Sequence, residues 1–251
     1  MDPGDYDLLL DDWPYKSGVV SARQVMTRGG RPVVQVRVEL GILQMELEGR
    51  PDGARPEGCD SYLDYLTKRR FAESDLFELS DEDRYEIDHE IAIYNQRRLG
   101  LMALRDFRRT AGDARHVLDL LLLIAEVLPE DEWMIAHLRY LPLVIFHHIQ
   151  ASAMEAIIRS GPEAAIDCLD EGKTQLESLY ESPMIGEEGS EVIAPFIEQL
   201  DEMAEGLRSE FHIGRTLAEQ LEEAIAKEQY ELAAKIRDEM ARRGGHGGGS
   251  G

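Results

Sequence analysis

From Ser80 onward the sequence is a succession of segments with apolar residues at helical spacing, separated by glycine, proline and aspartate. The first opens with "SDED", where a serine cap and acidic residues suit the first turn of a helix. We expect this helix to run to Arg109, and Gly112-Asp113 to break the chain before a second helix that ends at Pro129. The chain is therefore predicted to be mainly α-helical.

The second half of this region continues in the same way. Pro142 lies inside the apolar segment 130–159 and is expected to kink it or to divide it into two helices, because proline removes a backbone donor. Segment 162–180 begins with a proline at the first helical position, which favours a helix start. A loop is predicted at 182–190, and then a helix at 191–211. Residues 80–212 are thus predicted to form one helical domain.

The N-terminal part has a different pattern. Segments 19–26 and 32–39 are β-branched and partly alternating, and the "TRGGR" between them supplies the glycines of a tight turn, so a β-hairpin is expected. Residues 42–47 are compatible with a third strand or with a short helix. A helix at 61–70 completes a small β-containing element at 19–70. The acidic residues 1–18 precede it, either as a mobile arm or as a segment lying on the domain.

Charge and composition exclude several classes of function. The chain has 27 Lys+Arg against 50 Asp+Glu, a formal net charge of −23, which disfavours direct binding to nucleic acid. The longest apolar stretch is interrupted by charges, so no membrane span is expected, and the acidic N-terminus differs from a secretory signal. Cys59 and Cys168 are far apart in sequence, which argues against a zinc site. A cytoplasmic protein with reduced thiols is predicted.

One stretch resembles a helical repeat. "SGPEAAIDCL" is similar to the middle of a tetratricopeptide repeat, in which a glycine-containing turn precedes a helix with a small residue, here Ala165, and an apolar one, here Leu169. "AGDARHVLDL" gives a weaker second copy, so the resemblance covers about 95–181. An ordinary helical bundle remains an equal alternative. If the helices stack as an array, its concave surface would be a docking face for a peptide.

The C-terminal segment 215–243 predicts two short amphipathic helices. The first apolar stripe consists of Leu217, Leu221, Ala224 and Ile225, and the second of Tyr230, Ala233, Ala234, Ile236 and Met240. Only "KEQ" lies between them, so the helices are expected to be antiparallel, with the two alanines allowing close approach. A hairpin this small covers only part of its apolar stripe. The remainder is available to a partner, and the Gly-rich residues 244–251 are expected to form a flexible tail.

This segment resembles the UVR motif, the helical hairpin of the excision-repair proteins UvrB and UvrC. The matching positions are Leu221, Glu222, Ala224, Ile225, Tyr230-Glu231, Ala233-Ala234 and Arg237-Asp238. The resemblance implies docking to a protein partner, which could be another UVR-hairpin protein or a second copy of this chain. The implied contact residues are Leu221, Ile225, Tyr230, Ala233, Ala234 and Arg237. Together with "LGILQMELEGRPDG" near the N-terminus, the hairpin is also similar to that of uncharacterised UVR-motif proteins of planctomycete-like bacteria.

The sequence shows no recognisable catalytic or metal motif. His137, His147 and His148 lack metal-binding spacing, and the carboxylates Asp81, Asp83, Asp88 and Glu90 are interpreted as a solvated helix cap. No catalytic residue, metal or cofactor is predicted.

Three hypotheses follow. The first is a non-catalytic adaptor that docks a partner through the hairpin, and the second is a regulator of nucleotide excision repair or DNA handling. The third is an enzyme with a site at the "GRPDG" turn, formed by Gln44, Glu46, Arg50 and Asp52. A plain terminal hairpin that folds back on its own domain remains the structural alternative for 215–243.

Overall fold

The computed structural model describes residues 10–129, 131–179 and 189–245. Three strands, β1 (Ser21–Met26), β2 (Pro32–Val38) and β3 (Gly41–Glu46), are followed by helices throughout the rest of the described chain. The helices are α2 (Tyr62–Glu73), α3 (Asp81–Ala103), α4 (Phe107–Val127), α5 (Glu132–Leu138), α6 (Leu141–Ser160), α7 (Pro162–Ser178), α8 (Gly189–Phe211), α9 (Leu217–Ala226) and α10 (Tyr230–Gly245), with short 3-10 turns η1 (Pro56–Gly58) and η2 (Ser74–Leu76). The mainly α-helical class with an N-terminal β element is confirmed.

The strands form an antiparallel meander in the order β1-β2-β3. The predicted hairpin is present, with Gly30 at φ 77° in its turn, and β3 at Gly41–Glu46 is the strand, rather than the helix, of the two alternatives for 42–47. The sheet packs against the end of α3, where Leu101 is buried against Val34 and Val36. Gly100 permits this contact, because a Cβ there would lie 2.6 Å from Val36 Cγ2.

The N-terminal segment lies on the sheet over the residues that are described. Trp13 Nε1 donates to Ser21 Oγ at 2.7 Å, and the carbonyl of Trp13 accepts from Arg37 Nε at 2.7 Å. The guanidinium of Arg23 stacks 4.3 Å from the indole ring. From residue 10 onward the acidic arm is therefore a segment that lies on the domain. Residues 1–9 lie outside the described chain.

The first helical boundary differs from the prediction. α3 ends at Ala103, and α4 runs without interruption through Gly112-Asp113. The actual break is at 104–106, where Arg105 adopts φ 60° and the Asp106 side chain caps α4 by accepting from Arg109 N–H. Because "AGDARHVLDL" is therefore helix interior, it is not equivalent to "SGPEAAIDCL", which begins at the α6–α7 turn.

Pro142 divides the next apolar segment as expected. The helix α5 ends at Leu138, and α6 begins at Leu141 with Pro142 in its first turn. Within the described residues, 132–160 is long and apolar enough by length and composition to cross a membrane. In this fold α6 instead lies between α4 and α7, and its side chains Val144, Phe146 and Ile149 belong to the main core.

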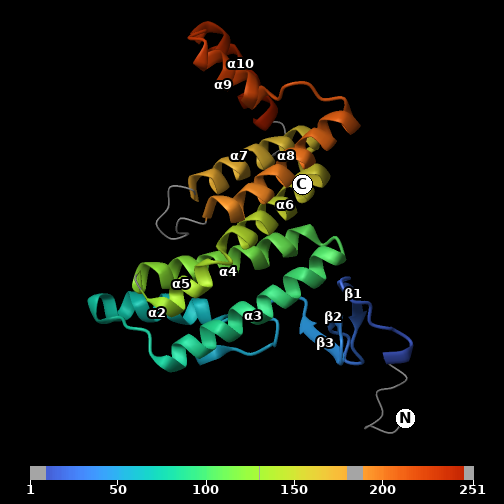
Figure 1. Cartoon of the computed structure of the whole chain (residues 1–251), viewed down its shortest axis with the longest axis vertical. Coiled ribbons are helices and arrows are strands. Elements are labelled where there is room, and N and C mark those ends of the chain that lie inside the picture. The colour runs from blue at the N-terminus through green and yellow to red at the C-terminus, as the bar shows by residue number, and fades with distance from the viewer. Residues whose placement is uncertain (1–9, 130, 180–188, 246–251) are drawn as a thin grey trace.

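Successive helices pack on one another from α3 to α8 (Figure 1). α3 packs on α4, α4 on α6, α6 on α7 and α7 on α8, while the short α5 packs on α4. α6 and α7 approach closely at Gly172, where a Cβ would lie 2.6 Å from Ile149 Cγ1. The predicted loop at 182–190 falls mostly outside the described residues, and its last two residues begin α8. The result is a row of helices that carries the sheet near its first members and the last two helices at the opposite end (Figure 1).

Candidate functional site

The predicted C-terminal hairpin is formed by α9 and α10, which pack on each other. α9 begins with a capping box, because Thr216 Oγ accepts from Glu219 N–H at 3.3 Å and the Glu219 carboxylate accepts from Thr216 N–H at 2.6 Å. Thr216 is only 2% exposed. The start of the hairpin is therefore fixed by its own sequence.

The turn at "KEQ" is a helix-terminating motif with two reversed backbone hydrogen bonds. Gln229 N–H donates to Ala224 C=O at 2.7 Å, and Glu228 N–H donates to Ile225 C=O at 2.9 Å. This pattern needs a left-handed residue after the helix, usually glycine. Here that residue is Glu228, at φ 56°. The chain thus turns sharply enough for α10 to start at Tyr230.

The inner face of the hairpin is a small cluster of its own. Ala224, Ala233 and Ile236 are at most 9% exposed, and Leu217, Leu221 and Met240 pack around them. Two of the six predicted contact residues, Leu221 and Ala233, therefore hold the two helices together. Ala234 is half-buried. While α9 and α10 are packed together, a partner can contact only the small exposed part of these side chains.

The outer face carries the other predicted contact residues. Ile225 is 53% exposed and Tyr230 is 68% exposed, although both had been placed in the apolar stripes of the hairpin. Arg237 is also exposed. Leu232, which the sequence analysis missed, is 46% exposed on α10. Ile225 and Tyr230 flank the turn, so the tip of the hairpin presents apolar side chains to solvent.

An arginine on α8 holds the hairpin to the helical row. Arg208 donates through Nη1 and Nη2 to the Glu219 carboxylate at 3.0 and 2.7 Å, and its Nη2 lies 3.4 Å from Asp170 Oδ2 on α7. The bond to Glu219 raises the pKa of Arg208. Burial alone would raise the pKa of Glu219, but Arg208 and the N–H of Thr216 outweigh it and lower the pKa. The carboxylate that caps α9 is thus also the anchor of the hairpin.

The carboxylates at the start of α3 correct one interpretation. The expected cap at Ser80 is present, because Ser80 Oγ accepts from Asp83 N–H and the Asp83 carboxylate accepts from Ser80 N–H. Asp81 and Asp88 are exposed, but Asp83 is only 3% exposed and Glu90 is fully buried, so the interpretation of these two as solvated is wrong. Glu90 accepts from Tyr62 N–H at 2.7 Å and Leu63 N–H at 3.0 Å, and lies 2.9 Å from His116 Nε2. Asp83 accepts two bonds from Arg69 and one from the Tyr62 hydroxyl.

These hydrogen bonds keep both buried carboxylates charged. Burial alone would raise the pKa of Glu90, but the bonds from His116 and from the backbone outweigh it and lower the pKa. The pKa of Asp83 is lowered far below its usual range in the same way, because Arg69, Tyr62 and Ser80 outweigh desolvation. Their arrangement joins α2 to α3, which is a structural role.

The remaining candidate residues do not converge on a metal. His147 and His148 lie on α6, whereas His137 on α5 lies 2.8 Å from Asp88 Oδ1. Over the described residues no group of three histidine, cysteine, aspartate or glutamate side chains is placed to hold a metal ion.

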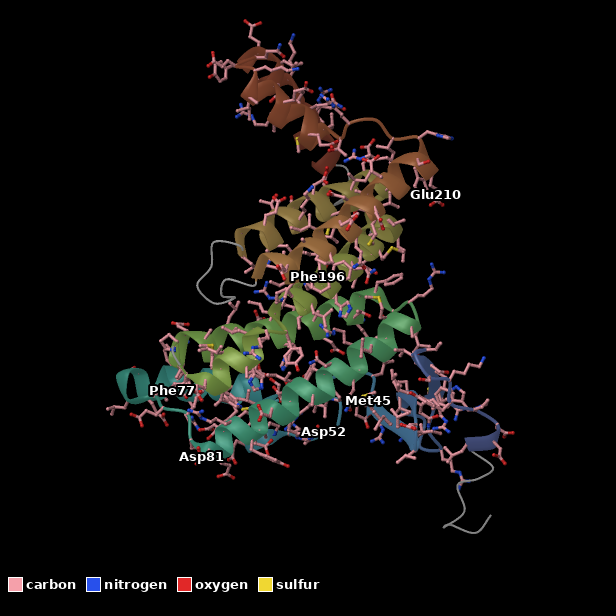
Figure 2. The ribbon with its side chains drawn as sticks, in the orientation of Figure 1. Met45, Asp52, Phe77, Asp81, Phe196 and Glu210 are labelled. Carbon is pink, nitrogen blue, oxygen red and sulfur yellow. The ribbon has the colours of Figure 1, made fainter. Side chains whose placement is uncertain are left out.

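The four polar residues of the "GRPDG" region are divided by the structure. Gln44 is exposed and accepts from Gln35, and Glu46 pairs with Arg31 at 3.3 Å on the sheet. Arg50 and Asp52 instead line a cavity beside α3, and Figure 2 labels Asp52 there. Glu46 still lies beside the turn, because its N–H donates to Pro51 C=O at 2.8 Å, but its carboxylate pairs with Arg31 and Gln44 bonds Gln35. The four side chains therefore do not converge on one site.

These features define a mainly helical protein with a separate terminal two-helix hairpin, in which exposed apolar side chains flank a polar turn. The family model described as the UvrB/uvrC motif matches residues 215–242, which are the two helices of this hairpin. Neither the curated proteins nor the solved structures compared with the chain show a significant match. The chain thus carries a UVR motif, and this motif points to protein interaction in general.

Proposed function

We propose that the protein is a non-catalytic cytoplasmic adaptor that docks a partner protein through the UVR hairpin. The observation that carries the proposal is the exposed apolar tip, Ile225, Tyr230 and Leu232, on a hairpin whose own core is complete without them. Large apolar side chains at the end of a projecting element are typical of a recognition surface. The partner is another UVR-type hairpin or a second copy of this chain.

The geometry supports docking of the closed hairpin rather than its opening. Ala233 and Ile236 are buried against Ala224, so a partner that required them would have to separate α9 from α10. A closed hairpin offers Ile225 and Tyr230 from either side of one turn. These two side chains are the expected centre of the interface, with Arg237 on its polar margin.

The test compares the intact chain with an Ile225→Asp, Tyr230→Asp double variant. Both positions are exposed, so the hairpin should stay folded while the tip becomes charged. Leu40→Asp is the control, because Leu40 is 92% exposed in the turn between β2 and β3, remote from the hairpin. We expect sedimentation and affinity capture against purified UVR-motif proteins to show a complex with the intact chain and the control, and none with the double variant.

Equal binding by all three chains would contradict the docking role and leave the hairpin as a structural cap. The identity of the captured partner decides the second candidate, a regulator of nucleotide excision repair. That candidate rests on the same motif, which is named after UvrB and UvrC. It requires that a repair protein is bound through the tip and that the interaction is lost in the double variant.

A further inference from the structure

The β-hairpin of β1 and β2 carries a charge opposite to that of the whole chain. Residues 13–38 contain none of the chain's 50 acidic residues but five basic ones, namely Lys16, Arg23, Arg28, Arg31 and Arg37. Arg31 pairs with Glu46 at 3.3 Å, but over the described residues no carboxylate pairs with the other four. A surface with this local charge attracts an anionic group, although the chain as a whole is acidic.

Arg23, in the middle of β1, has a guanidinium that is fixed in place but not fully bonded. It stacks 4.3 Å from the ring centre of Trp13, and its Nε donates to Gln35 Oε1 at 2.8 Å. Gln35 in turn donates to Gln44, so this row of side chains is ordered across the sheet. Among the described residues, neither Nη group of Arg23 has a hydrogen-bond partner. Two adjacent N–H donors on a pre-positioned guanidinium match the two oxygens of a carboxylate.

β1 is also an edge strand whose outer side is open. The strand order is β1-β2-β3, and no described backbone group outside β2 bonds to β1. Where the ladder meets the turn, Thr27 N–H donates inward to Arg31 C=O at 2.9 Å. Inward and outward groups alternate along an antiparallel ladder, so the residues of β1 with outward N–H and C=O groups are Ala22, Gln24 and Met26. This row of backbone groups can pair with an added strand.

The two faces of β1 carry different side chains at this edge. Arg23 lies on the outer face of the sheet, with Gln35 opposite it on β2. Because side chains alternate along a strand, Met26 lies on the other face with Ala22, and Met26 is 65% exposed. A strand added beside β1 would meet a cation on one face and an exposed apolar side chain on the other. The matching sequence therefore alternates acidic and apolar residues.

Two other occupants fit this edge less well. A second copy of the chain that paired through its own β1 would bring basic side chains next to basic side chains, which is unfavourable between neighbouring strands. β1 has six residues and is about 20 Å long, so a nucleic acid strand would extend past it toward the acidic helices. A short acidic peptide segment avoids both conflicts.

We propose that the outer edge of β1 binds an extended segment of a partner protein in which acidic and apolar residues alternate. The segment adds a fourth strand to the sheet, and one of its carboxylates binds the two Nη groups of Arg23. A residue directly opposite Arg23 belongs to a pair without backbone bonds, where side chains approach most closely. The sheet and the UVR hairpin are at opposite ends of the helical row (Figure 1), so this site does not rest on docking by the hairpin.

The experiment titrates the intact chain with four probes and follows backbone amide shifts. The first probe is acetyl-Glu-Val-Glu-Val-Glu-amide, and acetyl-Gln-Val-Gln-Val-Gln-amide is its uncharged equivalent. The third, acetyl-Glu-Pro-Glu-Pro-Glu-amide, keeps the charge but lacks the N–H groups that would bond β1. A six-nucleotide oligothymidylate tests for binding of single-stranded nucleic acid.

Two variants test the two halves of the proposed site. Arg23→Gln removes the guanidinium, and its matched control is Arg139→Gln, which removes the same charge from an exposed position at the end of α5. Gln24→Pro removes an outward N–H from β1 but no bond to β2, which an edge strand tolerates. Circular dichroism shows whether each variant is folded, and the Arg23→Gln test stands if Gln24→Pro is not.

We expect the Glu-Val peptide to shift amides at 21–26 and to bind about tenfold more tightly than the Gln-Val or Glu-Pro peptide. Arg23→Gln and Gln24→Pro should each weaken its binding about fivefold to tenfold, and Arg139→Gln should not change it. The Ile225→Asp, Tyr230→Asp variant should bind this peptide as the intact chain does, whatever becomes of docking by the hairpin.

Three results would overturn the proposal. Equal binding of the Gln-Val peptide, or an equal loss in Arg139→Gln, would exclude recognition of a carboxylate by Arg23. Equal binding of the Glu-Pro peptide would exclude strand addition. Tighter binding of the oligothymidylate than of the Glu-Val peptide, with shifts at 21–26, would assign the basic hairpin to single-stranded nucleic acid.

Discussion

Two glycines inside helices show how much one missing side chain can matter. Gly172 faces Ile149 so closely that a Cβ would lie 2.6 Å from Cγ1, whereas Gly112 on α4 has nothing within 4 Å. We expect Gly172→Ala to lower the free energy of unfolding by about 1–3 kcal/mol, because a packed core resists an added methyl group. Gly112→Ala should raise it by up to about 1 kcal/mol through helix propensity. Urea unfolding of both variants checks the prediction, and a similar loss in both would contradict it.

The half-buried His147 gives the fold an acid sensitivity. Burial, and secondarily the charge of Arg98, lower the pKa of His147 from 6.5 to about 4. Between these pH values the unfolded chain binds a proton that the folded chain does not, so stability is complete above pH 6.5 and is lost as the pH falls toward 4.

We expect His147→Gln to remove roughly 1–2 kcal/mol of this pH-dependent loss, a figure discounted for the partial exposure of the ring. The measurement is the urea midpoint across this pH window. The exposed His212 serves as control in the variant His212→Asn, which keeps a residue that tolerates φ 54°. An unchanged slope in His147→Gln would show that other groups titrate.

For single residues, the sequence did not predict which charged side chains are buried. Asp83 and Glu90 are in register with Ile87 and Leu101 on α3, so the helical period alone placed them on the inner face. Their charge predicted that they would be exposed to solvent. They are buried because Arg69 on α2 and His116 on α4 bind them, and a sequence does not show which helices will be neighbours. Their burial could have been predicted from their position, because both carboxylates have the same helical spacing as the buried apolar residues of α3.

At the scale of elements, the turn of the UVR hairpin contains a correctable strain. Glu228 adopts φ 56° in a position where glycine is preferred. We expect Glu228→Gly to stabilise the hairpin by about 1 kcal/mol, because glycine has no Cβ to strain the left-handed conformation. Amide hydrogen exchange at Ala224, Ala233 and Ile236 reports on the hairpin alone. Lys227→Gly, at φ −90°, is the control and should reduce protection there.

The anchor between α8 and α9 sets how the hairpin is held. Arg208 contacts Glu219 and Asp170 at once, so Arg208→Gln should loosen the hairpin without unfolding either part. We expect faster tumbling of α9 and α10 in ¹⁵N relaxation, and only about 1 kcal/mol of lost stability, since such partly exposed pairs contribute little. Arg159→Gln, which removes a within-helix pair on α6, should leave the relaxation unchanged.

Element boundaries were predicted well where a proline or the Ser80 cap sets them, and poorly between α3 and α4. Pro142 and Pro162 each lie in the first turn of a helix, as expected from the missing backbone donor. Gly112-Asp113 was expected to be a break, yet Asp113 is buried and bonded to Arg97, which keeps α4 continuous. The boundary is instead set by Asp106, which caps the first turn of α4. The sequence around Asp106 contains no glycine or proline, so it gave no sign that α3 ends there.

For the whole molecule, charge is divided unevenly between the hairpin and the rest of the chain. Residues 215–243 have six basic and seven acidic residues, so nearly all of the net charge of −23 lies elsewhere. A nearly neutral hairpin with exposed apolar side chains beside its turn suits another hairpin, because no strong charge repulsion opposes their approach.

The main core and the hydrophobic cluster of the hairpin are separate, which predicts that the helical domain keeps most of its stability without the hairpin. The main core draws on α2 to α8, and the cluster of Ala224, Ala233 and Ile236 shares no residue with it. A chain ending at residue 214 loses only the contacts of the hairpin, of which the ion pair of Arg208 with Glu219 is the principal one.

We therefore expect the shortened chain to unfold cooperatively with a midpoint within about 4 °C of the intact chain, since about 1 kcal/mol is lost. Calorimetry measures this midpoint. As a control, Leu101→Ala removes a fully buried contact between α3 and the sheet and should cost about 2–5 kcal/mol. If the shortened chain aggregated or lost its cooperative transition, the hairpin would be part of the folding unit of the helical domain. This result would contradict the proposal that the hairpin is a separate element available to a partner.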